Sequence, residues 1–213
     1  TKLKEDPLRI MRAIRFACVL DFDIEEKLYQ KIKEYNYLVN KLSKERIKSE
    51  FEKILLCKNF NKALKIMKDT GIADILNIEY NEINYVADPL GMWAQIKVSN
   101  IPFTNIEKGN IIKIAEVLSL GKIDNIILYN YGLYICTIAG KILNISPQKI
   151  SNKYNKLTIK SRHDINIESK DIINLYGPCK KVGEIYEELE KQILTKKLNN
   201  KKTEILKYLE KRK

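Results

Sequence analysis

Residues 4–17 read KEDPLRIMRAIRFA and predict a helix. The Asp6 carboxylate is suited to an N-cap, because it can accept hydrogen bonds from the free N–H groups of a first turn. Pro7 fits the first helical position, where its missing N–H is no loss. An arginine recurs every third residue, at Arg9, Arg12 and Arg15, so the guanidinium groups form a stripe that spirals around the axis. A separate apolar face is formed by Ile10, Ala13, Ile14 and Ala17.

Helical periods and helix-capping residues continue along the chain, so the sequence predicts an all-α fold. In the first part, helices are expected over residues 7–20, from 24–26 to Val39, from the N-cap Ser43 to Leu55, over 59–70, and in a short run over 72–76. Gly71 stands where a helix C′ glycine is expected. Residues 77–103 lose the helical period, with turns expected at Asp88-Pro89 and Pro102.

The second half is again predicted to be helical. Helices are expected over 106–120, 124–143, a short segment from Pro147, 169–176, 181–195, and the end of the chain. The apolar, tyrosine-rich segment 124–143 has strand propensity, but its length and the N-cap Asp124 favour a buried helix. We expect Tyr129, Tyr131 and Tyr134 to pack in the core; base stacking is the alternative.

Composition favours a polyanionic partner. The 213 residues carry a formal net charge of +12, although a coding bias toward Lys, Ile and Asn is an alternative cause. No apolar run has the length of a membrane span and no secretory signal is visible, so we expect a cytoplasmic protein. The first residue is Thr, which suggests part of a longer protein. The four cysteines are scattered and the one histidine, His163, has few partners nearby, so neither a metal site nor a disulfide framework is expected.

Two motifs carry a family resemblance. The first is Glu5-Asp6-x-x-Arg9 running into R-x-x-R-F-A, and the second is Leu42-Ser43-Lys44-Glu45-Arg46-Ile47-x-x-Glu50-x-x-Lys53-Ile54-Leu55. Together they resemble the nucleotide-selecting motif and the neck-stabilising segment of class II CCA-adding tRNA nucleotidyltransferases and bacterial poly(A) polymerases. The resemblance is strong over about residues 3–76 and weaker from about Lys156 onward.

The resemblance implies roles for individual residues. Asp6 and Arg9 would bind the nucleotide base, and Arg12 and Arg15 would contribute further along the helix. Glu5 would orient Arg9 or a neighbour. Supporting roles in the neck fall to Ser43, Glu45, Arg46 and Glu50. Local chemistry leaves an alternative open, in which Asp6 only caps its helix and Arg9 only pairs with Asp6.

Hydrogen-bond chemistry explains how Asp6 and Arg9 can select a base. Cytosine and adenine both place an amine donor beside a ring-nitrogen acceptor. A carboxylate supplies acceptors only and a guanidinium supplies donors only, so the pair matches both bases. Uracil and guanine place a carbonyl beside an N–H, so each contact would face a like group, at a cost of about 1–3 kcal/mol per unsatisfied group.

The resemblance also predicts three regions: a neck over residues 1–78, a body over 79–155 and a tRNA-binding tail over 156–213. The basic tail would contact RNA, with Lys196, Lys197, Lys201 and Lys202 as candidates. A solvated terminal helix is the alternative interpretation of this lysine-rich segment.

The family's catalytic motifs are missing from this sequence. Neither the G-G-x-x-x-R-D stretch nor a D-x-D pair on a sheet is present, and Asp21-Phe22-Asp23 falls in a turn between helices. We therefore expect the neck, body and tail of an enzyme that transfers CMP and AMP from CTP and ATP to the tRNA 3′ end, with Mg²⁺ held by an α/β head outside this chain. Alternatives are the same portion of a poly(A) polymerase or of an enzyme adding only CC or only A, or a stand-alone helical RNA-binding module.

Overall fold

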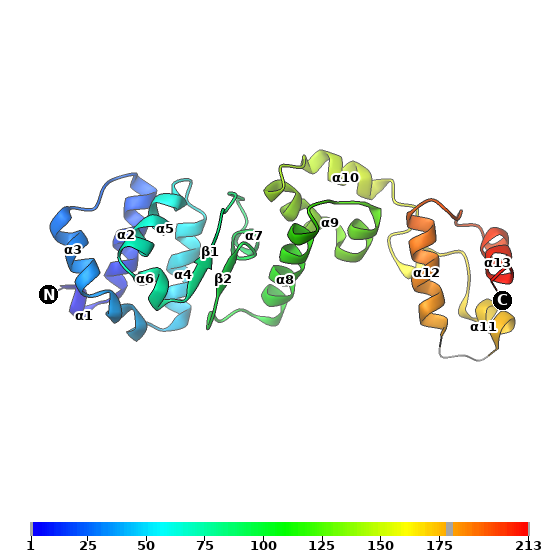
Figure 1. Cartoon of the computed structure of the whole chain (residues 1–213), viewed down its shortest axis with the longest axis horizontal. Coiled ribbons are helices and arrows are strands. Elements are labelled where there is room, and N and C mark those ends of the chain that lie inside the picture. Colours follow the sequence, from blue (N-terminus) through cyan, green and yellow to red (C-terminus); the bar gives the residue numbers. More distant parts are fainter. Residues whose placement is uncertain (1, 178–180, 213) are drawn as a thin grey trace. The chain divides into compact units, whose positions relative to one another are not determined.

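The computed structural model describes residues 2–177 and 181–212, and these residues are mostly helical (Figure 1). The prediction of an all-α fold is confirmed; the strands in the described residues form one two-stranded ribbon. The chain divides into two compact units, Thr1–Ser119 and Leu120–Lys213. The three regions expected from the sequence stay a prediction.

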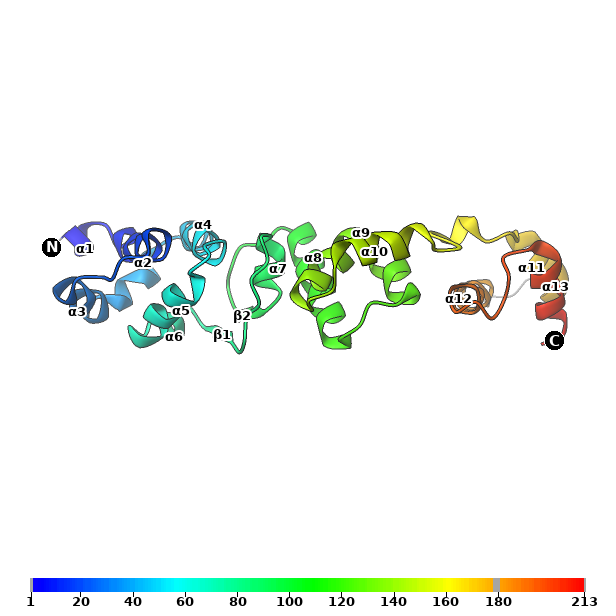
Figure 2. The same cartoon turned by 90° about the horizontal axis from the view of Figure 1, so that it is seen from above.

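The first unit begins with helices around a shared apolar core. They are α1 (Lys2–Glu5), α2 (Leu8–Leu20), α3 (Glu26–Glu34), the 3₁₀ helix η1 (Asn36–Lys41), α4 (Lys44–Leu55), α5 (Phe60–Asp69) and α6 (Ile72–Ile75). Figure 2 shows α1 next to α2, and Asp6 and Pro7 separate the two helices along the chain. The α2 helix packs against α4 and α5.

The buried face of α2 differs slightly from the predicted one. Ile10 and Ile14 are fully buried as expected, but Ala13 is only half-buried and Met11 is fully buried in its place. On α4, Phe51 and Ile54 face the same core with no exposed surface. Each large apolar side chain buried in this way contributes about 1.5–3 kcal/mol relative to its exposed state.

The second predicted helix is shorter than expected. It ends at Glu34, because Tyr35 leaves the helical region at φ −108°, and the chain continues as a 3₁₀ helix that buries Leu38 and Val39. Asn36 fixes this change of direction, because its Nδ2 donates to the Thr70 carbonyl at 2.7 Å.

Residues 77–103 contain a small antiparallel ribbon that the sequence did not predict. Strand β1 (Ile78–Tyr80) pairs with β2 (Ile96–Val98), with Ile78 opposite Val98. The turn predicted at Asp88-Pro89 is instead the start of the short helix α7 (Pro89–Trp93), because Asp88 Oδ1 accepts from the Gly91 N–H at 2.9 Å.

The helix α8 (Asn105–Leu120) follows the ribbon, and α4 anchors its start. Lys48 Nζ lies 2.7 Å from Glu107 Oε1 and over the Phe103 ring. On the same side of α4, Trp93 Nε1 donates to Glu52 Oε1 at 3.0 Å.

The second unit contains α9 (Asn125–Ile142), α10 (Pro147–Asn155), the 3₁₀ helix η2 (Arg162–Asp164), α11 (Ser169–Tyr176), α12 (Val182–Leu194) and α13 (Lys202–Glu210). The buried helix predicted from Asp124 is present, and Asp124 Oδ1 caps it by accepting from the Ile127 N–H at 3.0 Å. Gly132 kinks the helix with φ 76° and ψ 172°. Tyr129 and Tyr131 are half-buried, whereas Tyr134 is 47% exposed.

The cysteines of the described residues are free thiols: Cys18 and Cys136 are buried and Cys57 is half-buried. Cys179 lies outside the described residues. Among the residues that the structure describes, none of the helices combines the length and apolarity needed to cross a bilayer.

Gly71 tests the capping of α5, with Gly109 in the middle of α8 as the control. Gly71 is the expected C′ residue at φ +74°, and an added Cβ would meet Asn36 Nδ2 at 3.0 Å. Gly71→Ala is expected to lower the free energy of unfolding by about 1–2 kcal/mol, because L-residues are strained at this φ. Gly109→Ala, inside α8 with nothing within 4 Å of the new Cβ, should raise it by about 0.5–1 kcal/mol. Urea denaturation of both variants checks this; equal effects would contradict it.

Candidate functional site

Asp6 lies between α1 and α2 and makes two interactions. Its Oδ1 accepts from the Leu8 N–H at 3.2 Å, and its Oδ2 lies 3.6 Å from Arg9 Nε. The helix begins at Leu8, so Pro7 occupies the N-cap position and Asp6 precedes it by one residue. The predicted N-cap is therefore wrong by one residue, although the Asp6 carboxylate still accepts from the first helical N–H and faces Arg9.

The Asp6–Arg9 pair remains accessible to a ligand. The Asp6 side chain is 40% exposed and the Arg9 side chain 52% exposed. An ion pair this exposed contributes at most about 1 kcal/mol to stability, because water screens it. The Asp6 carboxylate oxygens and the Arg9 N–H groups are thus exposed side by side. Breaking their ion pair would cost little stability.

Arg15 is held within the fold, unlike Arg9. Its Nε donates to Glu50 Oε2 at 2.7 Å, and Lys53 Nζ lies 2.9 Å from the other carboxylate oxygen. Glu50 is only 5% exposed. Burial by itself would raise the pKa of the Glu50 carboxyl, but the hydrogen bonds from Lys53 and Arg15 outweigh it and hold that pKa below its usual value.

The two sequence motifs meet at one hollow. A cavity of about 490 Å³ is lined by Glu5 and Asp6 from the first motif and by Ser43 and Arg46 from the second. Ser43 is the N-cap of α4, as predicted, and its Oγ accepts from the Arg46 N–H at 3.4 Å. Glu45 is exposed and does not line this hollow. Residues about 40 positions apart are therefore brought together at the start of α2.

Arg9 and Arg12 line a second hollow, of about 620 Å³, together with Lys2 and Lys31. Lys31 lies on α3, outside both motifs, and sequence reasoning did not single it out. Its position on the outer face of a short amphipathic helix carried no signal that distinguished it from an ordinary solvated lysine.

Asp21 and Asp23 lie in the turn between α2 and α3, as predicted. Lys62 Nζ is 3.4 Å from Asp21 Oδ1 and 2.9 Å from Asp23 Oδ1, so the two carboxylates share one ammonium group. Among the described residues, no group of three or more His, Cys, Asp or Glu side chains is placed to hold a metal ion.

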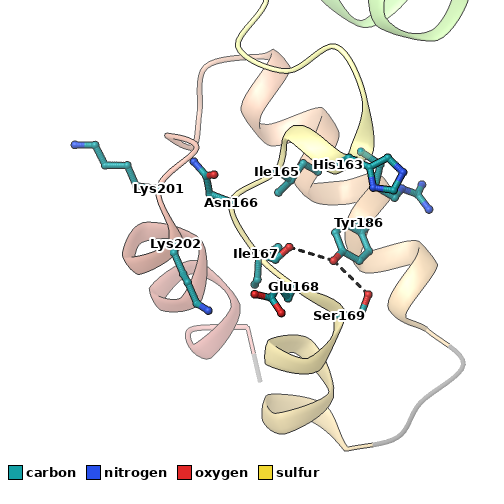
Figure 3. Close-up of a pocket in the computed structure, with 10 residues that line it drawn as sticks. His163, Ile165, Asn166, Ile167, Glu168, Ser169, Tyr186, Lys201 and Lys202 are labelled. Carbon is teal, nitrogen blue, oxygen red and sulfur yellow. Dashed lines mark hydrogen bonds between the residues drawn. The ribbon is translucent and has the colours of Figure 1, made fainter.

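The tail lysines fall into two groups. Lys196 and Lys197 are exposed in the turn after α12, whereas Lys201 and Lys202 line a hollow of about 840 Å³ (Figure 3). Arg162 and the exposed His163 line the same hollow.

Hydrogen bonds and ion pairs order this tail hollow. Tyr186 from α12 donates to the Ile167 carbonyl at 3.3 Å and lies 3.4 Å from Ser169 Oγ, as the dashed lines in Figure 3 show. Lys202 Nζ lies 2.7 Å from Asp171, and Arg162 Nε lies 2.8 Å from Glu190. The sequence did not single out Arg162, because its partner is 28 residues away.

Comparison with known proteins defines the class. The family model described as "tRNA nucleotidyltransferase domain 2 putative" matches residues 91–209, and the model described as "Probable RNA and SrmB- binding site of polymerase A" matches residues 21–83. The first match covers more than half of the chain, so the protein belongs to the tRNA nucleotidyltransferase family.

Curated relatives place it within that family. A CCA-adding enzyme of Ligilactobacillus salivarius is 31% identical over 94% of this chain and 58% of its own length, and one of Pediococcus pentosaceus is 28% identical over 96% and 60%. The chain thus belongs to the family of class II CCA-adding enzymes, as its two motifs predicted, and it spans about 60% of the length of these relatives.

Solved structures show the same fold. The crystal structure of the Bacillus stearothermophilus CCA-adding enzyme in complex with CTP matches with a TM-score of 0.85, at 21% identity, over 99% of this chain and 62% of that one. A complex of a CCA-adding enzyme with ATP matches with a TM-score of 0.58, at 18% identity, over 99% of this chain and 61% of that one.

Arg15 and Arg12 provide a matched test of the buried ion pair. Arg15→Met is expected to lower the free energy of unfolding by about 3 kcal/mol, because it removes one partner of a buried carboxylate. Arg12→Met, one turn earlier on the exposed side of α2, should change it by less than about 0.5 kcal/mol. Glu50 has a depressed folded-state pKa, so its contribution is present above the unfolded-state pKa and is lost as the pH falls through the folded-state value.

The difference in the free energy of unfolding between wild type and Arg15→Met should therefore shrink as the pH falls below about 4.5. Urea denaturation at several pH values measures this difference. A difference independent of pH, or an equal loss in Arg12→Met, would contradict the assignment.

Proposed function

We propose that this chain is the nucleotide-selecting and RNA-binding part of an enzyme that adds CMP and AMP to the 3′ end of tRNA. The observation that supports the proposal most strongly is the Asp6–Arg9 pair, half-exposed and set beside a hollow where both family motifs meet. The curated relatives support the activity, since they are CCA-adding enzymes.

In this proposal Asp6 and Arg9 bind the Watson–Crick edge of the incoming base. The Asp6 carboxylate accepts from the exocyclic amine of cytosine or adenine, and the Arg9 guanidinium donates to the adjacent ring nitrogen. Arg9 turns from Asp6 toward the base without a large cost, because their ion pair is exposed and weak. Glu5, at the end of α1, lines the same hollow as Asp6 and helps to orient Arg9.

The remaining residues of the motifs support this base-binding edge. Ser43 and Arg46 line the same hollow from the start of α4, and Glu45 lies in the first turn of that helix. Arg12 contributes positive charge toward the nucleotide. For Arg15 we propose a positioning role, since its contact with Glu50 fixes α2 against α4.

Phosphoryl transfer itself requires groups that the described residues do not bring together. Such chemistry uses two divalent metal ions that activate the attacking oxygen and neutralise developing charge. Because no metal-binding cluster is present among the described residues, the proposal assigns Mg²⁺ and the catalytic carboxylates to another part of the full-length enzyme.

The tail hollow is proposed to contact the tRNA backbone. Lys201, Lys202 and Arg162 line it, and cations of this kind bind phosphates without reading sequence; His163 lines the same hollow. Lys196 and Lys197, exposed in the adjacent turn, extend the same basic surface.

Nucleotide choice tests the base-reading role. The full-length protein is given a tRNA lacking its CCA end with each of the four nucleotides, for wild type, Asp6→Ala and Arg9→Ala, with the exposed Asp74→Ala as the carboxylate control. Wild type and Asp74→Ala should add C, C and A and then stop. Asp6→Ala and Arg9→Ala should lower the preference for CTP over UTP by about tenfold or more, because the mismatch cost of like groups disappears.

Other outcomes separate the alternatives. A run of A would indicate a poly(A) polymerase, addition of only CC or only A would indicate those enzymes, and no addition would favour an RNA-binding module. Unchanged nucleotide preference in both variants would reduce Asp6 and Arg9 to a helix cap and its ion pair.

Salt dependence tests the tail. The double variant Lys201→Gln/Lys202→Gln of the full-length protein should bind tRNA more weakly, and the slope of log Kobs against log salt should fall by about 1–2, roughly one unit for each phosphate that is no longer neutralised. Lys65→Gln/Lys68→Gln, both exposed on α5, serves as the matched control. An equal loss of affinity in the two double variants would show only a general effect of charge.

A further inference from the structure

Two cysteines that are distant in the sequence lie together in the first unit. Cys18 belongs to the last turn of α2, and Cys57 lies in the turn between α4 and α5, about 40 positions along the chain. The two thiol side chains are hydrogen-bonded to each other. They are neighbours because α2 packs against both α4 and α5.

The two thiols differ in their access to solvent. Cys18 has no exposed surface, whereas Cys57 is half-buried. Cys57 is also outside the regular helices, because α4 ends at Leu55 and α5 begins at Phe60. A dissolved oxidant therefore reaches Cys57, while Cys18 is shielded from it by the fold.

The environment of Cys18 keeps its thiol protonated. Burial, the interaction with Cys57 and the charge of Asp21 raise the pKa of the Cys18 thiol to about 12, and the Lys62 ammonium opposes them only in part. Because the thiolate is the form that attacks a peroxide, Cys18 does not react first. It does carry the proton that a leaving hydroxide needs when a neighbouring oxidised sulfur is attacked.

Cys136 provides an internal comparison. It has no exposed surface either, and burial raises the pKa of its thiol to about 11. Its Sγ, however, donates to the Ile127 carbonyl at 3.6 Å. A buried cysteine of this kind behaves as a small apolar side chain and is chemically inert. The contact between two thiols, one of them accessible, distinguishes Cys18 and Cys57 from such core packing.

We propose that Cys57 and Cys18 are a peroxide-oxidation site and form a reversible disulfide. The proposal is separate from nucleotide selection and RNA binding and depends on neither. Intracellular disulfides, where they occur, are usually transient and redox-sensing, and a pair with one accessible and one shielded thiol suits that use.

The oxidation takes place in two steps. The Cys57 sulfur attacks one oxygen of hydrogen peroxide, the O–O bond breaks, and Cys57 becomes a sulfenic acid; the second oxygen leaves as water with the proton of the Cys57 thiol. The Cys18 sulfur then attacks the Cys57 sulfur, the S–O bond breaks, and the hydroxide leaves as water with the Cys18 proton. Two thiols thus lose two electrons, and the peroxide is reduced to two waters. A dithiol reductant returns the two electrons by thiol–disulfide exchange and becomes a disulfide itself.

The disulfide has two consequences for the first unit. It joins the end of α2 to the turn after α4, so it adds a covalent link between the two helices that Arg15 and Glu50 already connect. It closes a loop of about 40 residues, which restricts the unfolded chain. It also consumes the sulfenic acid of Cys57 before a second peroxide converts it irreversibly to the sulfinic acid.

Peroxide treatment of the full-length protein tests the proposal. The reduced, folded protein is freed of reductant, exposed to hydrogen peroxide, and then unfolded in N-ethylmaleimide, which blocks the thiols that remain. Tryptic peptides are identified by mass spectrometry with and without dithiothreitol. The variants are Cys18→Ala, Cys57→Ala and the control Cys136→Ala, and their melting temperatures confirm that they fold.

Trypsin places the two cysteines on different peptides, residues 16–27 and 54–58. In wild type and Cys136→Ala we expect these peptides linked, at a mass about 2 Da below their sum because two hydrogens are lost, and released by dithiothreitol. Dimedone, which labels sulfenic acids, should label Cys57 at least about fivefold more in Cys18→Ala than in wild type, because no neighbouring thiol consumes the sulfenic acid there. In Cys57→Ala, Cys18 should stay unlabelled.

Three results would overturn the proposal. They are N-ethylmaleimide on both cysteines after peroxide treatment of wild type, a linked peptide that joins Cys57 to a cysteine other than Cys18, and equal dimedone labelling of Cys57 in wild type and Cys18→Ala. The same treatment in urea is the folding control, since a link that depends on the packing of α2 should become rare there. The readouts involve neither nucleotide choice nor RNA binding, so they stand or fall separately from the proposed function.

Discussion

The contact between Arg15 and Glu50 fixes α2, the helix at the hollow beside Asp6 and at the hollow beside Arg12. A carboxylate that is 5% exposed is stable only when its charge is matched, and here Arg15 from α2 and Lys53 from α4 supply two hydrogen bonds to it. The contact fixes the rotation of α2 about its own axis relative to α4. Because Asp6 and Arg9 lie on or beside α2 and Ser43 and Arg46 start α4, that rotation also sets the geometry at the Asp6 hollow.

Three arginines of one helix face different surroundings because they lie at different angles around it. Arg9 is half-exposed beside Asp6, Arg12 is exposed at the hollow that Lys2 and Lys31 also line, and Arg15 contacts the buried Glu50. Arg15 also stacks on Phe16, so the residue that fixes α2 supports the aromatic ring of the neighbouring hollow. The repeat of three in the sequence therefore places one residue type in a half-exposed ion pair, at an open surface and in a buried contact.

Local signals in the sequence predicted much of this fold. Ser43 and Asp124 cap their helices and Gly71 ends one, because capping depends on residues within a single turn. The ribbon of β1 and β2 could not be predicted, since three-residue strands are too short to show a period. The end of α3 depends on Asn36 reaching Thr70, a contact 34 residues away. The motifs indicated Asp6 and Arg9, but the partner of Arg15 and the position of Lys31 at the hollow beside Arg12 depend on tertiary packing that no local pattern records.

A crystal structure of the full-length protein with CTP would test directly whether Asp6 and Arg9 bind the base edge. We expect the cytosine amine within hydrogen-bond distance of an Asp6 carboxylate oxygen, about 2.7–3.2 Å, and the ring nitrogen at the same range from the Arg9 guanidinium. A cytosine bound elsewhere, with the Asp6–Arg9 pair intact and its Leu8 contact unchanged, would contradict it.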